Sequence, residues 1–192
     1  LLKPSDGGPV AVPSQDMVLG IYYLTQERPG SIGEGHYFKN LNEAILAYEN
    51  GYVKLHSRIH VRVTKKMPDG TEKTGTVEST LGRFIFNEIL PQDLGFVDRS
   101  KPENDLLLEV DFHVGKKGLK QILEKVINIH GATTTAEVLD DIKAMGYKYS
   151  TRAAMTVSIS DMTVPEKKPA LIKQAQDTVD IITKNYKRGL IT

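Results

Sequence analysis

The sequence predicts an α+β fold, in which a small antiparallel β-hairpin packs among several short helices and a long, protruding C-terminal helix follows. The first observation is a period of two between residues 53 and 63, where apolar side chains alternate with basic or imidazole ones. The second is the helical spacing of apolar residues in several short segments that end at glycine or proline. The third is an apolar helical stripe from residue 165 to about residue 187.

Two short helices are predicted before the hairpin. Ser14 is expected to cap the first, and the glycine-rich segment 29–35 ends it. Its expected apolar residues are Val18, Leu19, Tyr22 and Tyr23. Asn40, followed by Glu43 three residues later, forms a capping-box pattern for a second helix that stops at Gly51.

The hairpin is predicted from residues 53–63, a turn at residues 67–70 and a returning strand at residues 71–77. Period two places five basic or imidazole side chains on one face of the first strand: Lys54, His56, Arg58, His60 and Arg62. Thr80 is expected to cap the helix that follows, with Pro91 as its stop.

The segment of residues 91–110 is predicted to be largely a loop. Two helices are expected after it. The first ends at Gly131, and Thr134 or Thr135 caps the second, which ends at Gly146.

The long C-terminal helix is expected to begin with Pro165 at its first position. Its apolar stripe is formed by Leu171, Ala175, Val179, Ile182 and Tyr186. Such a stripe is typical of a helix that pairs with an antiparallel partner helix.

The amino-acid composition limits which classes of protein and which kinds of binding site the chain can represent. The net charge is +1, so any binding to phosphate depends on local clusters of charge. The absence of cysteine excludes disulfides and thiolate zinc sites. No apolar run reaches the 18 or so residues that a membrane-spanning helix needs. Because the first residue is not methionine, we expect the chain to be a segment of a longer sequence.

Signatures of an independent enzyme are missing. Gly30, Gly33 and Gly35 match neither a dinucleotide-binding fingerprint nor a phosphate-binding P-loop. His56 and His60 would lie about 13 Å apart on a strand, which is too far to share a metal ion. Adjacent acidic residues in the helix before Gly146 point to different sides of it, which favours solvated surface over a magnesium site. We therefore predict no metal site and no catalytic residue in this chain.

Four blocks carry a family resemblance. They are Val-Pro-Ser-Gln-Asp-Met-Val-Leu-Gly-Ile-Tyr-Tyr-Leu-Thr at 12–25, Thr-Leu-Gly-Arg-Phe-Ile-Phe-Asn-Glu-Ile-Leu-Pro at 80–91, Ser-Asp-Met-Thr-Val-Pro-Glu-Lys-Lys at 160–168, and residues 186–192, which end Gly-Leu-Ile-Thr. In this order they resemble the part of the bacterial RNA polymerase β′ subunit just downstream of its catalytic aspartate loop. The resemblance covers residues 1–192.

The resemblance implies a role within a larger enzyme, a DNA-directed RNA polymerase (nucleotidyltransferase). The family's metal-binding Asn-Ala-Asp-Phe-Asp-Gly-Asp motif does not occur here, so the chain is expected to be inactive alone and to hold no cofactor, with Mg²⁺ bound elsewhere in the complete enzyme. Residues 1–162 are expected to form the pore, or secondary-channel, domain. Residues 163–192 are expected to form the first helix of the coiled coil at the channel rim.

The resemblance also suggests roles for particular residues. The five basic or imidazole residues of the first strand would line the channel for nucleotides and extruded RNA, although a solvated strand face is the simpler alternative. Gln15 and Asp16 would lie at the edge of the active centre, or merely begin a helix. The rim would dock factors through Lys184, Lys187 and Arg188, or these would be a solvated helix face. Arg83 and Arg152 are expected to be structural, salt-bridging residues.

The implied partners are the remaining β′ segments, the β subunit, DNA, RNA and nucleotides through the complex, and transcript-cleavage or other secondary-channel factors. The implied location is the bacterial cytoplasm, in association with the nucleoid and not with a membrane. The competing hypothesis is a free-standing α+β module that binds nucleic acid or protein through the basic strand.

Overall fold

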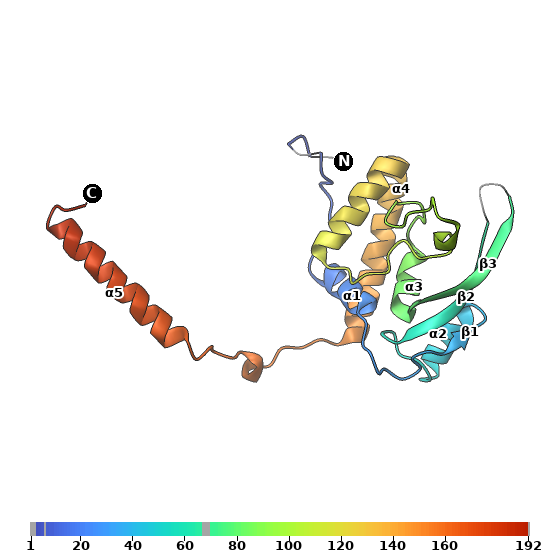
Figure 1. Cartoon of the computed structure of the whole chain (residues 1–192), viewed down its shortest axis with the longest axis horizontal. Helices are drawn as coiled ribbons and strands as arrows, with labels where there is room; N and C mark the ends of the chain where they lie inside the picture. Colours follow the sequence, from blue (N-terminus) through green and yellow to red (C-terminus); the bar gives the residue numbers. More distant parts are fainter. Residues whose placement is uncertain (1–2, 6, 67–69, 192) are drawn as a thin grey trace. The chain divides into compact units, whose positions relative to one another are not determined.

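The computed structural model describes residues 3–5, 7–66 and 70–191 and divides the chain into two compact units. The first unit, Leu1–Met155, contains the sheet and four α-helices; the second, Thr156–Thr192, contains the C-terminal helix (Figure 1). The α+β fold class predicted from the sequence is confirmed. None of the described helices has the length and apolar character required to cross a membrane.

The first unit is built from short elements and one long helix. Its α-helices are α1 (Asp16–Thr25), α2 (Leu41–Glu49), α3 (Leu81–Asn87) and α4 (Lys116–Ala153). Its strands are β1 (Tyr37–Phe38), β2 (Arg58–Lys66) and β3 (Glu72–Thr80). The segment between α3 and α4 is irregular apart from one 3₁₀ turn, η1 (Pro102–Asn104), as the sequence predicted.

The sheet has the order β1-β2-β3. The predicted antiparallel hairpin is confirmed, with Arg58 opposite Thr80 and Lys66 opposite Glu72. Residues 67–69 of the predicted turn lie outside the described part of the chain. The two-residue strand β1 was not predicted; it pairs parallel to β2, with Tyr37 opposite His60.

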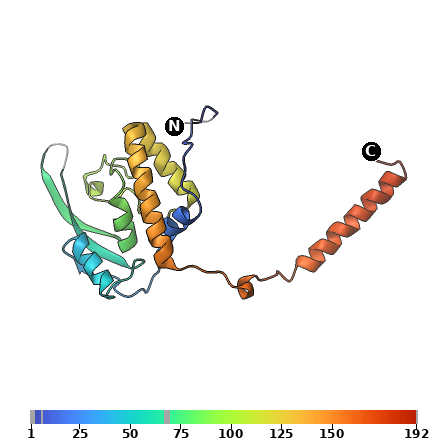
Figure 2. The same cartoon turned by 180° about the vertical axis from the view of Figure 1, so that it is seen from behind.

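Helix α3 lies between the sheet and the pair formed by α1 and α4 (Figures 1 and 2). One face of the sheet turns toward these helices, and its residues Ile59, Val61 and Val77 are buried. The hydrophobic core continues through α3 into the α1–α4 pair. The other face of the sheet carries the even-numbered residues of β2 and β3, which are exposed or only partly buried except Thr80.

Two of the predicted helix caps are confirmed. The side-chain oxygen of Asn40 accepts a hydrogen bond from the backbone N–H of Glu43 at 2.8 Å, and Thr80 Oγ1 accepts one from the N–H of Arg83 at 3.3 Å. Each cap satisfies a helical donor that has no partner within its own helix. These two caps fix where α2 and α3 begin.

The predicted start of α1 is wrong. Ser14 makes no side-chain cap; its carbonyl accepts from the N–H of Met17 at 3.1 Å, and Gln15 occupies the cap position. The predicted apolar face is also shifted. The residues buried on α1 are Gly20, Ile21, Leu24 and Thr25, whereas Tyr22 is 43% exposed. The buried face of α1 is the one that packs against α4, and it is not the most aromatic side of the helix.

Helix α4 contains the two helices that the sequence predicted. Their break lies at Gly131, whose φ of 79° and ψ of −173° are not helical. Thr135 does not cap the second part, because its hydroxyl donates to the carbonyl of Gly131 at 2.7 Å. The predicted end at Gly146 is wrong, since the helix continues to Ala153.

Gly146 serves as a packing position for α1. A Cβ atom added to Gly20 would lie 1.8 Å from the carbonyl oxygen of Gly146, and one added to Gly146 would lie 2.6 Å from the carbonyl oxygen of Met17. The two helix backbones therefore touch where both residues lack a side chain. A glycine chosen for close packing has the same appearance in the sequence as a glycine that ends a helix.

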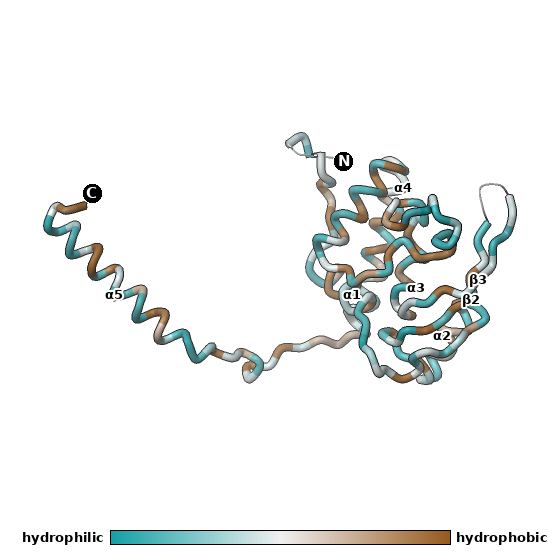
Figure 3. Tube along the Cα trace, in the orientation of Figure 1, coloured by the Kyte–Doolittle hydropathy of each residue, from teal (hydrophilic) through white to brown (hydrophobic). Residues whose placement is uncertain are grey.

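In the second unit, α5 spans Lys168–Lys187 and follows a 3₁₀ turn, η2 (Ile159–Asp161). The predicted start at Pro165 is wrong by one turn: Pro169 lies in the first turn of α5, and Pro165 accepts a hydrogen bond from the N–H of Lys168 at 3.0 Å. Polar and apolar residues alternate along α5 (Figure 3). Its apolar residues are largely exposed: Leu171 61%, Ile172 58%, Val179 53%, Ile182 52% and Tyr186 64%.

Candidate functional site

The predicted basic face is smaller than the sequence indicated. Strand β2 begins at Arg58, so Arg58, His60 and Arg62 share one face, whereas Lys54 and His56 precede the strand. The N–H of Lys54 donates to the carbonyl of Ile32, and the Lys54 carbonyl accepts from the N–H of Ser57 in a turn. The prediction that all five residues lie on one strand is wrong, because these local hydrogen bonds compete with the extended conformation.

The His56 side chain points into the protein interior. The residue is 5% exposed, its Nδ1–H donates to the carbonyl of Gln26 at 3.1 Å, and its ring meets the edge of Tyr23 at 4.7 Å between centroids. Nε2 is buried and has no hydrogen-bond partner within the described residues. Burial lowers the pKa of the His56 imidazole below its ordinary value, and nearby cationic groups act in the same direction.

This environment predicts a pH-dependent stability. The folded state holds His56 neutral, while the unfolded chain takes up a proton as the pH falls through about 6.5, the ordinary value for histidine. The free energy of unfolding should therefore fall as the pH decreases below that value. Urea unfolding at pH 7.5 and pH 5.5 measures the loss, which should be smaller in His56→Asn because its amide keeps a donor but has no titrating group. Parallel pH curves for the two proteins would contradict the assignment.

Arg58 is held by a cluster of carboxylates. Its guanidinium contacts Glu27 at 3.0 Å, Glu78 at 2.9 Å and Asp111 at 3.8 Å. The hydrogen bond to Glu78 and the charge of Glu27 raise the pKa of Arg58 against an opposing effect of burial, which is the largest single influence. Arg58 therefore ties β2 to the segment after α1, and its charge is already compensated.

Arg83 completes this ion cluster from the interior side. Its Nη1 contacts Glu27 at 3.1 Å and Asp111 at 3.2 Å, and its Nε donates to the carbonyl of Thr25 at 3.1 Å. The side chain is only 7% exposed. The predicted structural, salt-bridging role of Arg83 is confirmed. Arg152 forms no ion pair within the described residues and instead lies 5.7 Å from the ring of Tyr149.

His60 and Arg62 are the members of the predicted basic face that remain open on β2. The His60 ring stacks on Tyr37, with 4.2 Å between centroids and 12° between planes. Arg62 is exposed and has no ion pair within the described residues. Within the described residues, the outer face of the sheet thus combines a flat aromatic pair with an exposed arginine that forms no ion pair. Tyr37 was not singled out in the sequence because β1 was not predicted.

Gln15 and Asp16 lie at the start of α1, and both are exposed. Gln15 has φ 48° and ψ −121°, a backbone conformation that a residue with a Cβ rarely adopts, and its carbonyl accepts the N–H of Leu19 at 3.0 Å. Asp16 places a carboxylate in the first helical turn, where the helix dipole favours it. Among the described residues, neither side chain forms a hydrogen bond or ion pair with Arg58, whose partners are Glu27, Glu78 and Asp111.

Lys184, Lys187 and Arg188 lie at the C-terminal end of α5, and all are exposed. The helix ends at Lys187, and Gly189 follows the C-cap with a φ of 71°; the N–H groups of Gly189 and Leu190 donate to the carbonyls of Tyr186 and Asn185. Cations in the last turn interact favourably with the helix dipole. Their position is therefore explained by helix chemistry whether or not a partner binds them.

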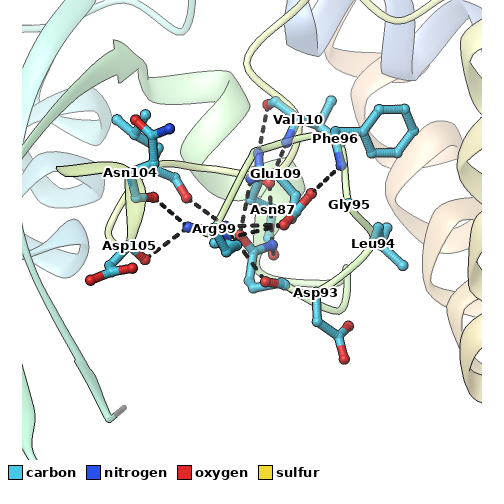
Figure 4. A network of polar contacts seen from close by, with 12 residues as sticks. Asn87, Asp93, Leu94, Gly95, Phe96, Arg99, Asn104, Asp105, Glu109 and Val110 are labelled. Atoms are coloured by element: carbon cyan, nitrogen blue, oxygen red, sulfur yellow. Dashed lines mark hydrogen bonds and ion pairs between the residues drawn. The ribbon is translucent and has the colours of Figure 1, made fainter. Parts of the chain in front are cut away.

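A buried ion pair in the loop before α4 was missed by sequence reasoning (Figure 4). Glu109 is 1% exposed and accepts hydrogen bonds from Arg99 at 3.1 Å and from the N–H of Phe96 at 2.9 Å. Arg99 also donates to the carbonyls of Asn104, Asp105 and Leu107. The signal was present, because Glu109 is an acid within the apolar run Leu-Leu-Leu-Glu-Val, where only a paired carboxylate is stable.

Nearby, Asn87 joins the same loop to α3. Its amide donates to the carbonyls of Arg83 and Val110, and its Oδ1 accepts the N–H of Val110 at 3.0 Å. Asn87 and Arg83 both belong to the block at residues 80–91. These hydrogen bonds anchor the loop to α3.

The described residues contain no group of three or more histidine, cysteine, aspartate or glutamate side chains that could hold a metal ion. Asp140, one of the acidic pair before Gly146, is 77% exposed and pairs with Lys143 at 3.0 Å.

Comparison with known proteins explains the order of the four sequence blocks. The family described as RNA polymerase Rpb1, domain 3, matches residues 1–162. The chain is 71% identical over 192 residues to the DNA-directed RNA polymerase subunit beta′ of Lachnoclostridium phytofermentans, of which it covers 15%. It is 58% and 50% identical, also over 192 residues, to the corresponding subunits of Acetivibrio thermocellus and Thermoanaerobacter pseudethanolicus, covering 16% of each. The resemblance found in the sequence is confirmed: the chain belongs to the RNA polymerase Rpb1 domain 3 family.

Proposed function

We propose that this chain is a non-catalytic part of the β′ subunit of a bacterial DNA-directed RNA polymerase. The observation that carries the proposal is 71% identity to a β′ subunit along all 192 residues. The chain spans about 15% of that relative's length, so the remaining β′ segments and the β subunit would supply the rest of the enzyme, and Mg²⁺ would bind outside this chain. The enzyme would act in the bacterial cytoplasm, in association with the nucleoid.

Within that subunit, residues 1–162 would form the pore domain and residues 163–192 the first helix of the rim. The open side chains on the outer face of the sheet, His60 and Arg62, together with Lys54 on the preceding turn, would line the path of nucleotides and RNA. Arg58 would act by holding the sheet, since three carboxylates already surround its guanidinium. Gln15 and Asp16 would lie toward the active centre, and the strained backbone at Gln15 is consistent with a position fixed for function.

The exposed apolar residues of α5 support the rim assignment. A helix with Leu171, Val179 and Ile182 more than half exposed gains stability when a second helix covers that stripe. In the complete subunit that partner would be the returning helix of the coiled coil. Lys184, Lys187 and Arg188 would then remain at its surface for transcript-cleavage or other secondary-channel factors.

A chimera tests the proposed function. The corresponding segment of the Lachnoclostridium phytofermentans β′ subunit is replaced by residues 1–192, and the subunit is assembled with its partners. Template-dependent incorporation of labelled nucleotides should be retained to within severalfold of the parent enzyme. The isolated chain should incorporate none, because its described residues offer no cluster for the metal ions that nucleotidyl transfer requires.

The matched control is the same β′ subunit with the segment deleted, which should neither assemble nor transcribe. Assembly with the β subunit is followed by size-exclusion chromatography. A chimera that assembles but does not transcribe, or one that fails to assemble although residues 1–192 are folded, would overturn the proposed function.

A further inference from the structure

The outer face of the three-stranded sheet carries an exposed aromatic ring beside a histidine and an arginine. Tyr37 is 74% exposed and lies flat against His60, at 4.2 Å and 12°. Arg62 is two residues along β2 from His60, on the same face and about 7 Å further along the strand. Thr64, Thr74 and Thr76 follow on this face, all of them exposed.

We propose that this face binds single-stranded RNA, with a base stacked on Tyr37 and the neighbouring phosphate held by Arg62. The choice of RNA rests on the proposed function, which places the chain in an enzyme that makes RNA. The stacking platform itself rests on the geometry of Tyr37, His60 and Arg62.

The exposed face of the Tyr37 ring can serve as a stacking surface for a base. His60 already covers one face of the Tyr37 ring, so the ring is held in a fixed plane and its exposed surface can receive a base without losing further rotational freedom. Proteins that bind single strands use aromatic rings in this way, because every base has a π-face. Bases in a duplex are already stacked on each other, which selects for a single strand.

Arg62 supplies the positive charge for the neighbouring phosphate. Arg58 lies on the same face but is engaged by Glu27, Glu78 and Asp111, so its charge is not available. Arg62 has no such carboxylate within the described residues. One free guanidinium next to the platform matches the single charge of a phosphodiester and is a poor match for a free triphosphate, which requires several cations. The charge on this face therefore favours an oligonucleotide over a free nucleotide.

Backbone hydrogen bonds hold β1, and with it Tyr37, against β2. The pairing of β1 with β2 is extended on the N-terminal side of Tyr37 by hydrogen bonds from the N–H of Gly35 to the Arg58 carbonyl and from the N–H of His60 to the His36 carbonyl, both 2.8 Å. The capped helix α2 follows β1 directly. The position of Tyr37 is thus set by the sheet and by α2 together.

Fluorescence anisotropy with the full 192-residue chain and a labelled ten-nucleotide single-stranded RNA at low salt tests the proposal. Tyr37→Ala should weaken binding by about fivefold to a hundredfold, and Tyr37→Phe should restore most of it because the ring remains. Arg62→Gln should weaken binding and reduce the slope of log Kd against log salt by about 0.7, the loss of one phosphate contact. Tyr37→Ala should leave that slope unchanged.

Matched controls are Tyr52→Ala, an exposed tyrosine outside the sheet, and Arg152→Gln, an exposed arginine on α4. Neither should change the affinity or the salt slope. ATP and duplex RNA should compete poorly with the labelled strand. Ultraviolet crosslinking of RNA that contains 5-bromouridine should modify Tyr37 in the unaltered chain.

Three outcomes would overturn the proposal: no binding at low salt, equal losses in the control variants, or displacement of the RNA by ATP at comparable concentration. The chimera experiment tests the proposed function independently of this inference. An active chimera whose isolated segment does not bind RNA would remove only this inference. A chimera without activity, combined with Tyr37-dependent RNA binding by the chain, would remove only the proposed function.

Discussion

Gly20→Ala should abolish the native packing of the first unit or lower its free energy of unfolding by more than about 3 kcal/mol. The added Cβ would lie 1.8 Å from the carbonyl oxygen of Gly146, so the clash is with backbone and no side-chain rotation relieves it. Gly82→Ala should have a comparable effect, because its Cβ would lie 1.9 Å from the carbonyl oxygen of Leu24. A loss of this size is a large part of the 5–15 kcal/mol that stabilises a typical domain.

Urea unfolding followed by circular dichroism measures both losses. Gly118→Ala is the matched control, since its Cβ would meet only side-chain atoms at 3.5 Å and beyond, within a helix. Alanine should there be neutral or stabilising by up to about 1 kcal/mol. An unfolding midpoint for Gly20→Ala equal to that of the unaltered chain would show that α1 and α4 do not cross as described.

These glycines show why the family could be identified from the sequence although the helix packing could not be predicted. Gly20 and Gly82 belong to the two blocks at residues 12–25 and 80–91 that carried the family resemblance, and both are places where backbones touch. Local chemistry was sufficient for the caps at Asn40 and Thr80 and for the hairpin, because each depends on residues close in sequence. The end of α4 required knowledge of α1, which lies more than a hundred residues earlier in the chain.

The candidate site was predictable only in part, for a related reason. Alternation correctly placed Arg58, His60 and Arg62 on one face of β2. It extended the strand too far, because Lys54 and His56 continue the pattern while their backbone is held in a turn by contacts with residues 26–32. Tyr37 could not be assigned, since a two-residue strand has no periodicity of its own. Its role depends on pairing with β2.

The neutralisation of Arg58 by nearby carboxylates could not be predicted from the sequence either. Its partners come from three separate segments: Glu27 after α1, Glu78 on β3 and Asp111 before α4. A pattern read along one strand counts every arginine as a free cation. Only the assembled fold separates Arg58, which ties segments together, from Arg62, which remains open.

Arg83→Met should cost about 3–5 kcal/mol in the free energy of unfolding, the range expected when one partner of a buried ion pair is removed. Methionine keeps much of the volume of arginine, but it leaves Glu27, Asp111 and the carbonyl of Thr25 without their interior donor. Arg58→Met should cost much less, because the Arg58 side chain is 33% exposed and water can replace part of its contacts. Arg83→Lys should recover little, since a single ammonium cannot reproduce the forked geometry of the guanidinium.

The double variant Arg83→Met with Asp111→Asn separates lost packing from uncompensated charge. If the cost of Arg83→Met comes from stranded carboxylates, neutralising Asp111 should restore part of the stability, and the two changes should be clearly non-additive. Urea unfolding of the four proteins in this cycle provides the coupling energy. Strict additivity, or equal losses for Arg83→Met and Arg58→Met, would show that the cluster is not anchored from its buried side. The effect arises because the carboxylates of Glu27 and Asp111 lie between the two arginines, and Arg83 is the one that water cannot replace.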